Sequence, residues 1–228
     1  MLVKDWMNTE VVTIEADDSM TRATKLMEQH GAEILAVMDK EGVLAGIVTS
    51  GDIKEFSPSK ATSLDAYELR YLIAKIKVKS IMNKSPLVIS HDLTIEEAAE
   101  VLVKEKLSGA PVVNQKGEIM GTLTLMDICR VLISLTGSSK RGVQFAFELV
   151  DRPGSIKEVT DLIRSYGGRI VSILSSHAKI TPGYRNVYVR AYYLDRQKLP
   201  QLIGEIKGKF TLRYMVDHRT NKREIYME

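Results

Sequence analysis

The chain has 228 residues, and its hydrophobic content of 44% is typical of folded proteins and too high for a disordered chain. No apolar run approaches the ~18 residues of a membrane helix, and we expect no signal peptide. The single cysteine, Cys129, excludes an internal disulfide, so these features together favour a cytoplasmic protein. Domains usually have about 100–150 residues, so the length predicts two compact units.

The charge is unevenly distributed along the chain. Residues 1–137 carry 15 Lys and Arg against 20 Asp and Glu, a net charge of −5. Residues 138–228 carry 17 against 9, a net charge of +8, and this change of sign supports a domain boundary near residue 138. The basic part could face nucleic acid, but we favour the alternative of a charge-complementary contact between domains or subunits.

The first predicted unit, residues 1–60, has the order β-α-β-β-α. A short apolar stretch at residues 11–14 precedes a helix that begins at Ser19. Two strands, ILAVMD and VLAGIVT, follow and are joined by a turn that contains Gly42, and a second helix closes the unit. Residues 61–76 are predicted to form a linker helix, because LDAYELRYLIAKIK has helical spacing of its apolar residues.

The same pattern returns 75 residues later, in residues 77–137. VKDWMN recurs as VKSIMN, and GIVTSGDI, which starts at Gly46, recurs as GTLTLMDI, which starts at Gly121. The two copies align from residue 3 to residue 53 without an insertion. A unit of about 50 residues buries too little surface to be very stable on its own, so we expect the two copies to pack on each other.

Both octapeptides contain Gly-x-x-Thr-x-x-Asp, as Gly46-Thr49-Asp52 and Gly121-Thr124-Asp127. One interpretation is structural: Thr-x-x-Asp at a helix start resembles a capping box. The other is functional: the helix N-terminus attracts a phosphate, the threonine donates to it, and the carboxylate accepts from two sugar hydroxyls. The glycine would let its strand approach another group closely. No P-loop pattern is present, so a nucleotidase of that class is excluded.

The doubled unit resembles a pair of CBS domains, a tandem module that binds adenosine nucleotides in many regulatory proteins. Both octapeptides match the family's ribose-phosphate signature, Gly-h-x-[Thr/Ser]-x-x-[Asp/Asn]. The resemblance implies that the aspartates hold the ribose hydroxyls, that the threonines face the phosphate, and that the second strand of each copy borders an adenine pocket. The residues implied to line these two pockets are Ile34, Ala36, Gly109 and Pro111. The first copy departs from the family at Ala36, where a proline is usual.

The resemblance implies an adenosine-containing ligand, such as AMP, ATP, S-adenosylmethionine or NAD. Few basic residues flank the motifs, so we expect a monophosphate or an adenosyl ligand in preference to a triphosphate. Arg130 lies three residues beyond Asp127 and could either help to bind a phosphate or pair with this aspartate on the helix surface. Lys54 lies two residues beyond Asp52 and could also reach a phosphate.

Residues 138–228 predict a further unit of order β-α-β-β-α-β, the ferredoxin-like plan. LVDRPGSIKEVTDLIRSYGGRIVSI closely resembles part of an ACT domain, a small-molecule sensor that commonly binds amino acids and works as a dimer. The resemblance implies that an amino-acid ligand would contact Asp151, Pro153 and Gly154, and a Cβ at Gly154 should crowd both the turn and the ligand. The alternative is a tight turn that only leads into a helix.

A CBS pair followed by an ACT domain resembles the AcuB-type acetoin-utilisation proteins, a family name that reflects genetic context and defines no biochemical activity. The four histidines are scattered, and no catalytic motif is visible. The sequence thus predicts an α+β protein that is not an enzyme, forms a homodimer, and senses an adenosine-containing ligand to regulate an unknown partner. The alternatives are a scaffold or nucleic-acid-binding protein that uses the basic C-terminal part, and an unrecognised small-molecule enzyme.

Overall fold

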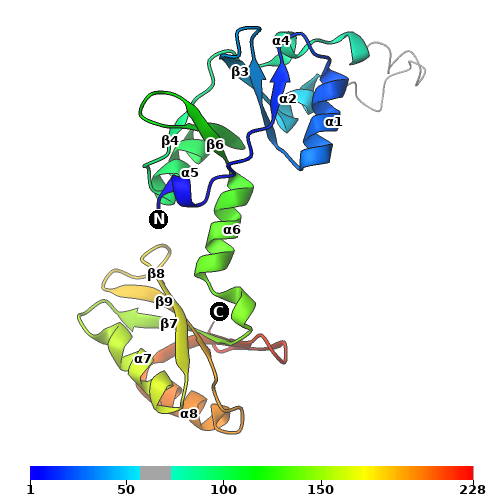
Figure 1. Cartoon of the computed structure of the whole chain (residues 1–228). Helices are drawn as coiled ribbons and strands as arrows, with labels where there is room; N and C mark the ends of the chain where they lie inside the picture. The colour runs from blue at the N-terminus through cyan, green and yellow to red at the C-terminus, as the bar shows by residue number, and fades with distance from the viewer. Residues whose placement is uncertain (57–72, 228) are drawn as a thin grey trace. The chain divides into compact units, whose positions relative to one another are not determined.

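The computed structural model describes residues 1–56 and 73–227 (Figure 1). The chain divides into two compact units, Met1–Arg130 and Val131–Glu228, and helix α6 (Leu125–Leu135) runs across the division. Of the predicted linker helix, only residues 73–76 are described, and residues 73–75 are helical. No helix among the described residues combines the length and apolarity that a membrane span requires.

Each sequence repeat forms one three-stranded sheet, as predicted, with a parallel pair of strands followed by an antiparallel pair. The elements of the first repeat are a short 3-10 helix η1 (Val3–Asp5), β1 (Thr13–Glu15), α1 (Met20–His30), β2 (Ile34–Met38), β3 (Leu44–Thr49) and α2 (Ser50–Glu55). Those of the second are α4 (Val78–Ile81), β4 (Ile89–Ser90), α5 (Ile95–Lys104), β5 (Gly109–Val113), β6 (Ile119–Thr124) and α6. The predicted order β-α-β-β-α is therefore confirmed in both copies.

Local sequence signals account for these elements. Thr94 begins α5 with a complete capping box, and the hairpin turns contain Gly42 and Gly117 at φ angles of 78° and 80°. One face of α1 and one face of α5 are buried, as their apolar spacing predicts: Met20, Ala23 and Met27 in α1, and Ile95, Ala98 and Leu102 in α5.

The two repeats exchange their first segments. VKDWMN belongs to the first repeat in the sequence, but Asn8 exchanges two backbone hydrogen bonds of 2.9 Å with Thr122 of the second repeat. VKSIMN makes the equivalent contact with the first repeat, where Asn83 and Ile47 exchange backbone hydrogen bonds of 2.9 and 3.0 Å. The two copies therefore depend on each other through main-chain pairing as well as through packing.

This exchange explains the first glycine of each motif. A Cβ on Gly46 would lie 2.4 Å from the backbone oxygen of Asn83, and a Cβ on Gly121 would lie 2.4 Å from the backbone oxygen of Asn8. Only glycine leaves room for these oxygens. Each glycine therefore makes the expected close approach, and the group that it approaches is the exchanged segment of the other repeat.

The C-terminal unit has the predicted β-α-β-β-α-β order and one further strand. Its elements are a short 3-10 helix η2 (Ser138–Lys140), β7 (Val143–Val150), α7 (Ser155–Ser165), β8 (Arg169–Ser176), β9 (Tyr184–Tyr192), α8 (Leu199–Lys209), β10 (Thr211–Asp217) and β11 (Lys222–Ile225). They form an antiparallel sheet in the order β11-β10-β7-β9-β8, with α7 and α8 on one face (Figure 1). The strand β11 is absent from the sequence prediction.

The core of this unit lies between the sheet and the two helices. Phe145 and Phe147 on β7 are fully buried, together with Ile163 on α7 and Ile206 on α8. The residues that alternate with this core along β7 and β9, among them Gln144 and Arg190, point to the opposite face of the sheet.

Candidate functional site

The Thr-x-x-Asp motif forms a complete capping box in both repeats, which confirms the structural interpretation. In the first, the Thr49 Oγ1 accepts from the Asp52 N–H (3.1 Å), and the Asp52 Oδ2 accepts from the Thr49 N–H and hydroxyl, both at 2.7 Å. In the second, the Asp127 Oδ2 accepts from the Thr124 N–H (2.9 Å) and hydroxyl (2.6 Å), and the Thr124 Oγ1 accepts from the Asp127 N–H (3.2 Å). The motif therefore fixes both side chains at the start of a helix.

Several groups that were expected to bind a phosphate already have hydrogen-bond partners within the protein. The Thr49 and Thr124 hydroxyls donate to their own aspartates, so in this structure their protons are not offered to a ligand. The first N–H of α6, on Leu125, donates to the backbone oxygen of Ser108 at 2.9 Å. In this structure the aspartate Oδ1 is the group that each motif presents, and donation from the threonines to a phosphate stays a prediction.

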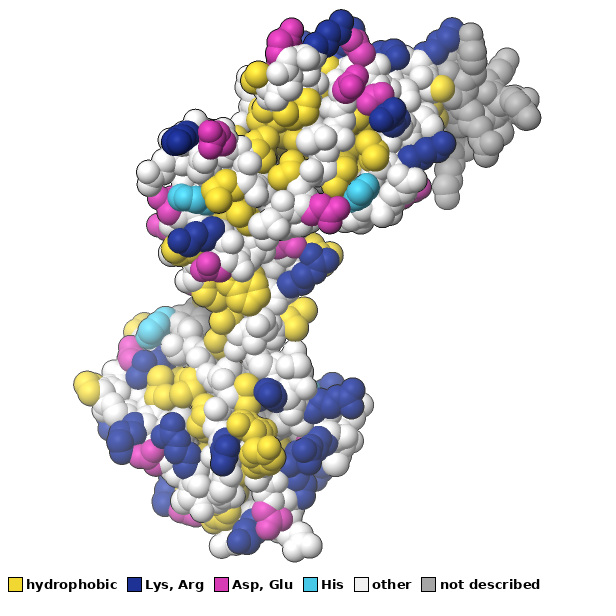
Figure 2. Space-filling model, viewed as in Figure 1, with side chains coloured by type: hydrophobic (Ala, Val, Ile, Leu, Met, Phe, Trp, Pro, Cys, Tyr) yellow, Lys and Arg dark blue, Asp and Glu magenta, His cyan; other side chains and the backbone are white. Residues whose placement is uncertain are grey.

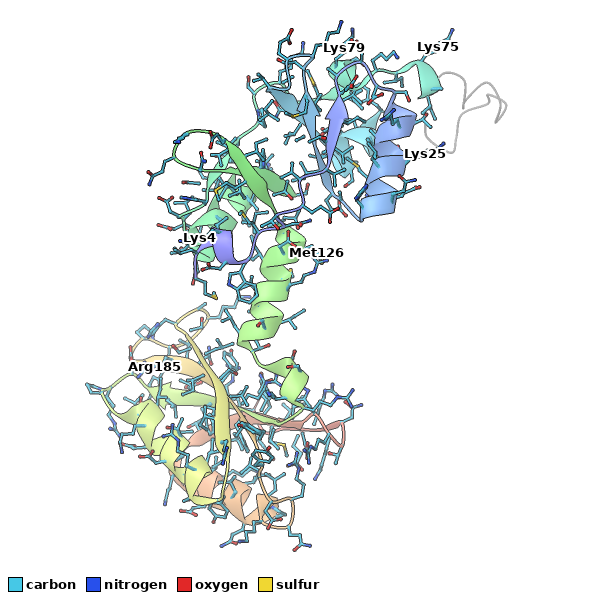
Figure 3. All side chains as sticks on the ribbon, viewed as in Figure 1. Lys4, Lys25, Lys75, Lys79, Met126 and Arg185 are labelled. Atoms are coloured by element: carbon cyan, nitrogen blue, oxygen red, sulfur yellow. The ribbon has the colours of Figure 1, made fainter. Side chains whose placement is uncertain are left out.

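A cavity of about 220 Å³ lies beside the second motif, within the N-terminal unit. It is lined by Asn8, Glu10, Gly31, Ala32, Glu33, Ile34, Thr122, Thr124, Met126, Asp127 and Arg130. Figure 3 labels Met126, one of these residues, at the start of α6. The cavity combines Ile34, a predicted base-lining residue of the first repeat, with Asp127 and Arg130 of the second, so the site is composite.

The other predicted residues lie outside this cavity. Ala36, Gly109 and Pro111 are buried, and a Cβ on Gly109 would lie 2.9 Å from the Ile34 Cδ1, so Gly109 supports the wall that Ile34 forms. The first motif, including Asp52, does not line it. Of the four residues predicted to line adenine pockets, Ile34 lines this cavity, and the roles of the other three stay predictions.

Sequence reasoning missed Asn8, Glu10 and Glu33. They stand far from the motif in the sequence and reach the cavity through the exchanged first segment and the end of α1. The repeated VKDWMN and VKSIMN segments were the available signal, but a repeat alone does not say which copy each segment contacts.

The cavity has more acidic than basic side chains. Glu10, Glu33 and Asp127 line it together with one arginine, Arg130. The Arg130 Nη1 lies 2.6 Å from the Asp127 Oδ1, which confirms that the two residues pair. The Arg130 side chain is 68% exposed, whereas that of Asp127 is only 12% exposed, so the aspartate is fixed and the arginine faces solvent.

The DRPG turn of the C-terminal unit holds a polar cluster. The Asp151 Oδ2 lies 2.9 Å from the His177 Nε2, and the Asp151 Oδ1 lies 3.3 Å from the Nε of Arg185, a residue labelled in Figure 3. The Arg185 Nη2 donates to the buried Ser155 Oγ at 3.2 Å. These contacts hold the turn against β9.

The cavity at this turn differs from the prediction. It has a volume of about 260 Å³, and Arg152 and Ser155 line it, whereas Asp151, Pro153 and Gly154 do not. A Cβ on Gly154 would meet no heavy atom within 4 Å, so the expected crowding of the turn is wrong. The φ of 88° is the reason for a glycine there.

The basic charge of the C-terminal unit is partly neutralised locally. Figure 2 shows Lys and Arg side chains spread over the visible face of this unit. Some of them pair with acids, as in Arg152–Glu158 (2.8 Å) and Lys209–Glu205 (2.6 Å). Within the part of the chain that the structure describes, no cluster of three or more His, Cys, Asp or Glu side chains could hold a metal ion.

The model of the CBS domain family matches residues 3–59 and 78–134, which together make up half of the chain. The protein belongs to the CBS-domain family. Its CBS pair is 29% identical, over 135 residues, to a CBS domain-containing protein of Dictyostelium discoideum, a match that covers 59% of this chain and 93% of that protein.

Solved structures of CBS proteins are also similar to this chain. A CBS-domain-containing protein of Agrobacterium tumefaciens has 22% identity and a TM-score of 0.50, with 58% of this chain and 93% of that chain covered. CBSX2, crystallised in complex with AMP, has 28% identity and a TM-score of 0.46, with 58% of this chain and 96% of that chain covered. The two segments that the CBS family model matches coincide with the two sequence repeats, which confirms the tandem pair.

Proposed function

We propose that the CBS pair is a regulatory sensor of one adenosine-containing ligand, bound in the composite cavity. The observation that carries this proposal is the combination of the buried Ile34 with Asp127, whose Oδ2 is held by its capping box. An apolar wall suits a purine ring, and the Asp127 Oδ1 can accept from a ribose hydroxyl. No bond-breaking group is required for this role.

The Arg130 pair is compatible with ligand entry. Arg130 occupies the Asp127 Oδ1 that the ribose would use, but exposed ion pairs contribute only about 0–1 kcal/mol. Two hydroxyls can replace the guanidinium at little cost, and Arg130 then becomes available to an anionic group of the ligand.

The charge and size of the cavity favour a small ligand with few phosphates. Three carboxylates against one guanidinium oppose a triphosphate, and the volume of about 220 Å³ lies below the ~300–1,000 Å³ of most ligand pockets. AMP or an adenosyl compound such as S-adenosylmethionine therefore fits better than ATP or NAD. Larger ligands would extend into solvent.

A thermal-shift and calorimetry panel tests this choice. AMP, ATP, NAD, S-adenosylmethionine and S-adenosylhomocysteine would be compared at constant ionic strength. A ligand at 100 times its Kd should stabilise the protein by about 2.7 kcal/mol. The last two compounds differ by one methyl group and one positive charge, so Glu33→Gln should reduce the preference for the charged one. Binding of none of the five would reject the sensor proposal.

We further propose that the C-terminal unit is an ACT domain that forms a homodimer. The β-α-β-β-α-β order and the DRPG turn support this assignment, and β8 lies at a sheet edge that a second copy could extend. Light scattering at micromolar concentration should give a dimer mass, and a monomer mass would reject the proposal.

The cavity beside Arg152 and Ser155 is the candidate site for an amino acid, and calorimetry with the full set of amino acids tests it. The absence of heat with every amino acid would make the ACT unit a dimerisation module only. In this proposal, the ligand bound by the CBS pair regulates a partner protein whose identity is not known.

A further inference from the structure

Arg190 is a buried charge on the face of the C-terminal sheet that α7 and α8 do not cover. It lies in β9, is 5% exposed, and donates through its Nη2 to the Gln144 Oε1 at 2.8 Å. Its Nε and Nη1 are also buried, and neither has a hydrogen-bond partner among the described residues. Two of the three guanidinium nitrogens are therefore buried and without a hydrogen-bond acceptor among the described residues.

The chain after α6 closes over this arginine. The Ser172 Oγ, on the neighbouring strand β8, donates to the backbone oxygen of Thr136 at 3.0 Å. A Cβ on Gly137 would lie 2.1 Å from the Val171 Cγ1 and 3.9 Å from the Arg190 Cδ, so the backbone passes directly over the side chain. A cavity of about 20 Å³ remains between them, lined by Thr136, Gln144, Ser172, Leu174, Tyr188 and Arg190.

No described side chain supplies the missing negative charge. Arg190 takes part in none of the ion pairs found among the described residues, whereas the neighbouring buried Asp217 is held by Arg196 at 3.0 Å. Burial raises the pKa of Tyr214, which keeps this phenol neutral. Burial also lowers the pKa of His218, and Arg190 lowers it further, so the imidazole is kept neutral and adds no second positive charge. An uncompensated buried ion costs several kcal/mol, and a counter-ion removes much of that cost.

We propose that this cavity binds one monatomic anion of the size of chloride, held by the Nε and Nη1 of Arg190. The volume of about 20 Å³ exceeds the ~10–15 Å³ that one water requires. It is too small for a phosphate or for the carboxylate of an amino acid. The site lies wholly in the C-terminal unit and is independent of the adenosine site.

Unfolding experiments on the full chain test this site. The midpoint temperature would be followed in mixtures of sodium chloride and sodium gluconate at constant ionic strength. The wild type should become more stable along a saturating curve as chloride replaces gluconate. Arg190→Met should abolish this dependence, whereas the matched variant Arg164→Met, which removes an exposed arginine of α7, should retain it. Identical chloride curves for the wild type and Arg190→Met would overturn the proposal.

A second measurement does not depend on the folding of the variant. Crystals of the wild type soaked in sodium bromide should give an anomalous difference peak between Arg190, Ser172 and Tyr188. A peak there supports the anion site, and the absence of a peak in this cavity overturns it.

Discussion

The two CBS repeats carry nearly identical motifs in different surroundings. The Oδ2 of Asp52 and that of Asp127 accept from the threonine hydroxyls at 2.7 and 2.6 Å, so the helix starts are equivalent. Only the second aspartate also accepts from an arginine and lines the cavity with Ile34. The comparison teaches that the motif determines how a helix begins, whereas the residues brought to it from the other repeat determine whether it lines this cavity.

The largest expected loss of stability concerns the glycines against which the exchanged segments pack, a feature that both repeats share. Gly46→Ala and Gly121→Ala should each destabilise the protein by about 1–3 kcal/mol or more, because the new Cβ would lie 2.4 Å from a backbone oxygen. Urea unfolding measures this loss. Gly204→Ala is the matched control, because its Cβ would meet nothing within 4 Å and alanine favours a helix by up to ~1 kcal/mol. A loss in only one of the two glycine variants would show that the exchanged segments are not equivalent.

Removal of the capping threonine should destabilise the protein less than the glycine variants do, and by a similar amount in the two repeats. Thr49→Ala and Thr124→Ala each remove a side chain that accepts from a helix N–H, which should cost about 0.5–2 kcal/mol. Thr124→Ala should in addition weaken ligand binding, because the Asp127 carboxylate loses a hydrogen bond that orients it. Thermal unfolding with and without ligand separates the two effects. Equal ligand-induced shifts in both variants would break the proposed difference between the repeats.

The hairpin turns offer a test away from the site. The Asp39 Oδ1 accepts from the N–H groups of Glu41 and Val43 (3.0 and 2.8 Å), and the Asn114 Oδ1 makes two equivalent bonds (2.9 and 3.0 Å). Asp39→Ala and Asn114→Ala should therefore each cost about 1 kcal/mol of stability, without a change in ligand affinity. Loss of binding in either variant would contradict the position of the ligand in the composite cavity.

The smallest expected effect on stability concerns Arg130. Arg130→Gln removes an i,i+3 ion pair whose arginine is mostly exposed, so the free energy of unfolding should change by less than about 0.5 kcal/mol. Its effect on binding should depend on the ligand's charge: the affinity for AMP should fall, and that for S-adenosylmethionine should not. Calorimetry with both ligands measures this difference. An equal loss for both would assign Arg130 to the shape of the site and not to its charge.

The elements could be predicted where the pattern of residues is local. The capping box at Thr94, the turns at Gly42 and Gly117, and the buried faces of α1 and α5 all depend on neighbours within a few positions. The strand β11 escaped prediction because Lys222–Ile225 is short and mostly charged, and it is stabilised by pairing with β10. Its existence depends on a partner strand, which local composition does not reveal.

Some residues that line the cavity could be predicted from the sequence, whereas others depend on contacts between the two repeats. Asp127, Arg130 and Ile34 were recognised from the repeat and the family signature, and all three line the cavity. Glu10 and Glu33 were not recognised, because their position follows from the exchange of VKDWMN and VKSIMN between the copies. That exchange leaves the repeated sequence unchanged, so sequence periodicity alone cannot distinguish exchanged from unexchanged segments.

The most direct test of the account compares Asp127→Ala with Asp52→Ala in calorimetry with the adenosine ligand that binds best. A hydrogen bond to a charged group contributes about 1.5–3 kcal/mol, so Asp127→Ala should raise Kd ten-fold or more. Asp52→Ala should have a smaller effect on Kd, although both variants lose a similar amount of stability through the capping box. Equal affinities of the wild type and Asp127→Ala would contradict the assignment of this aspartate to the ribose.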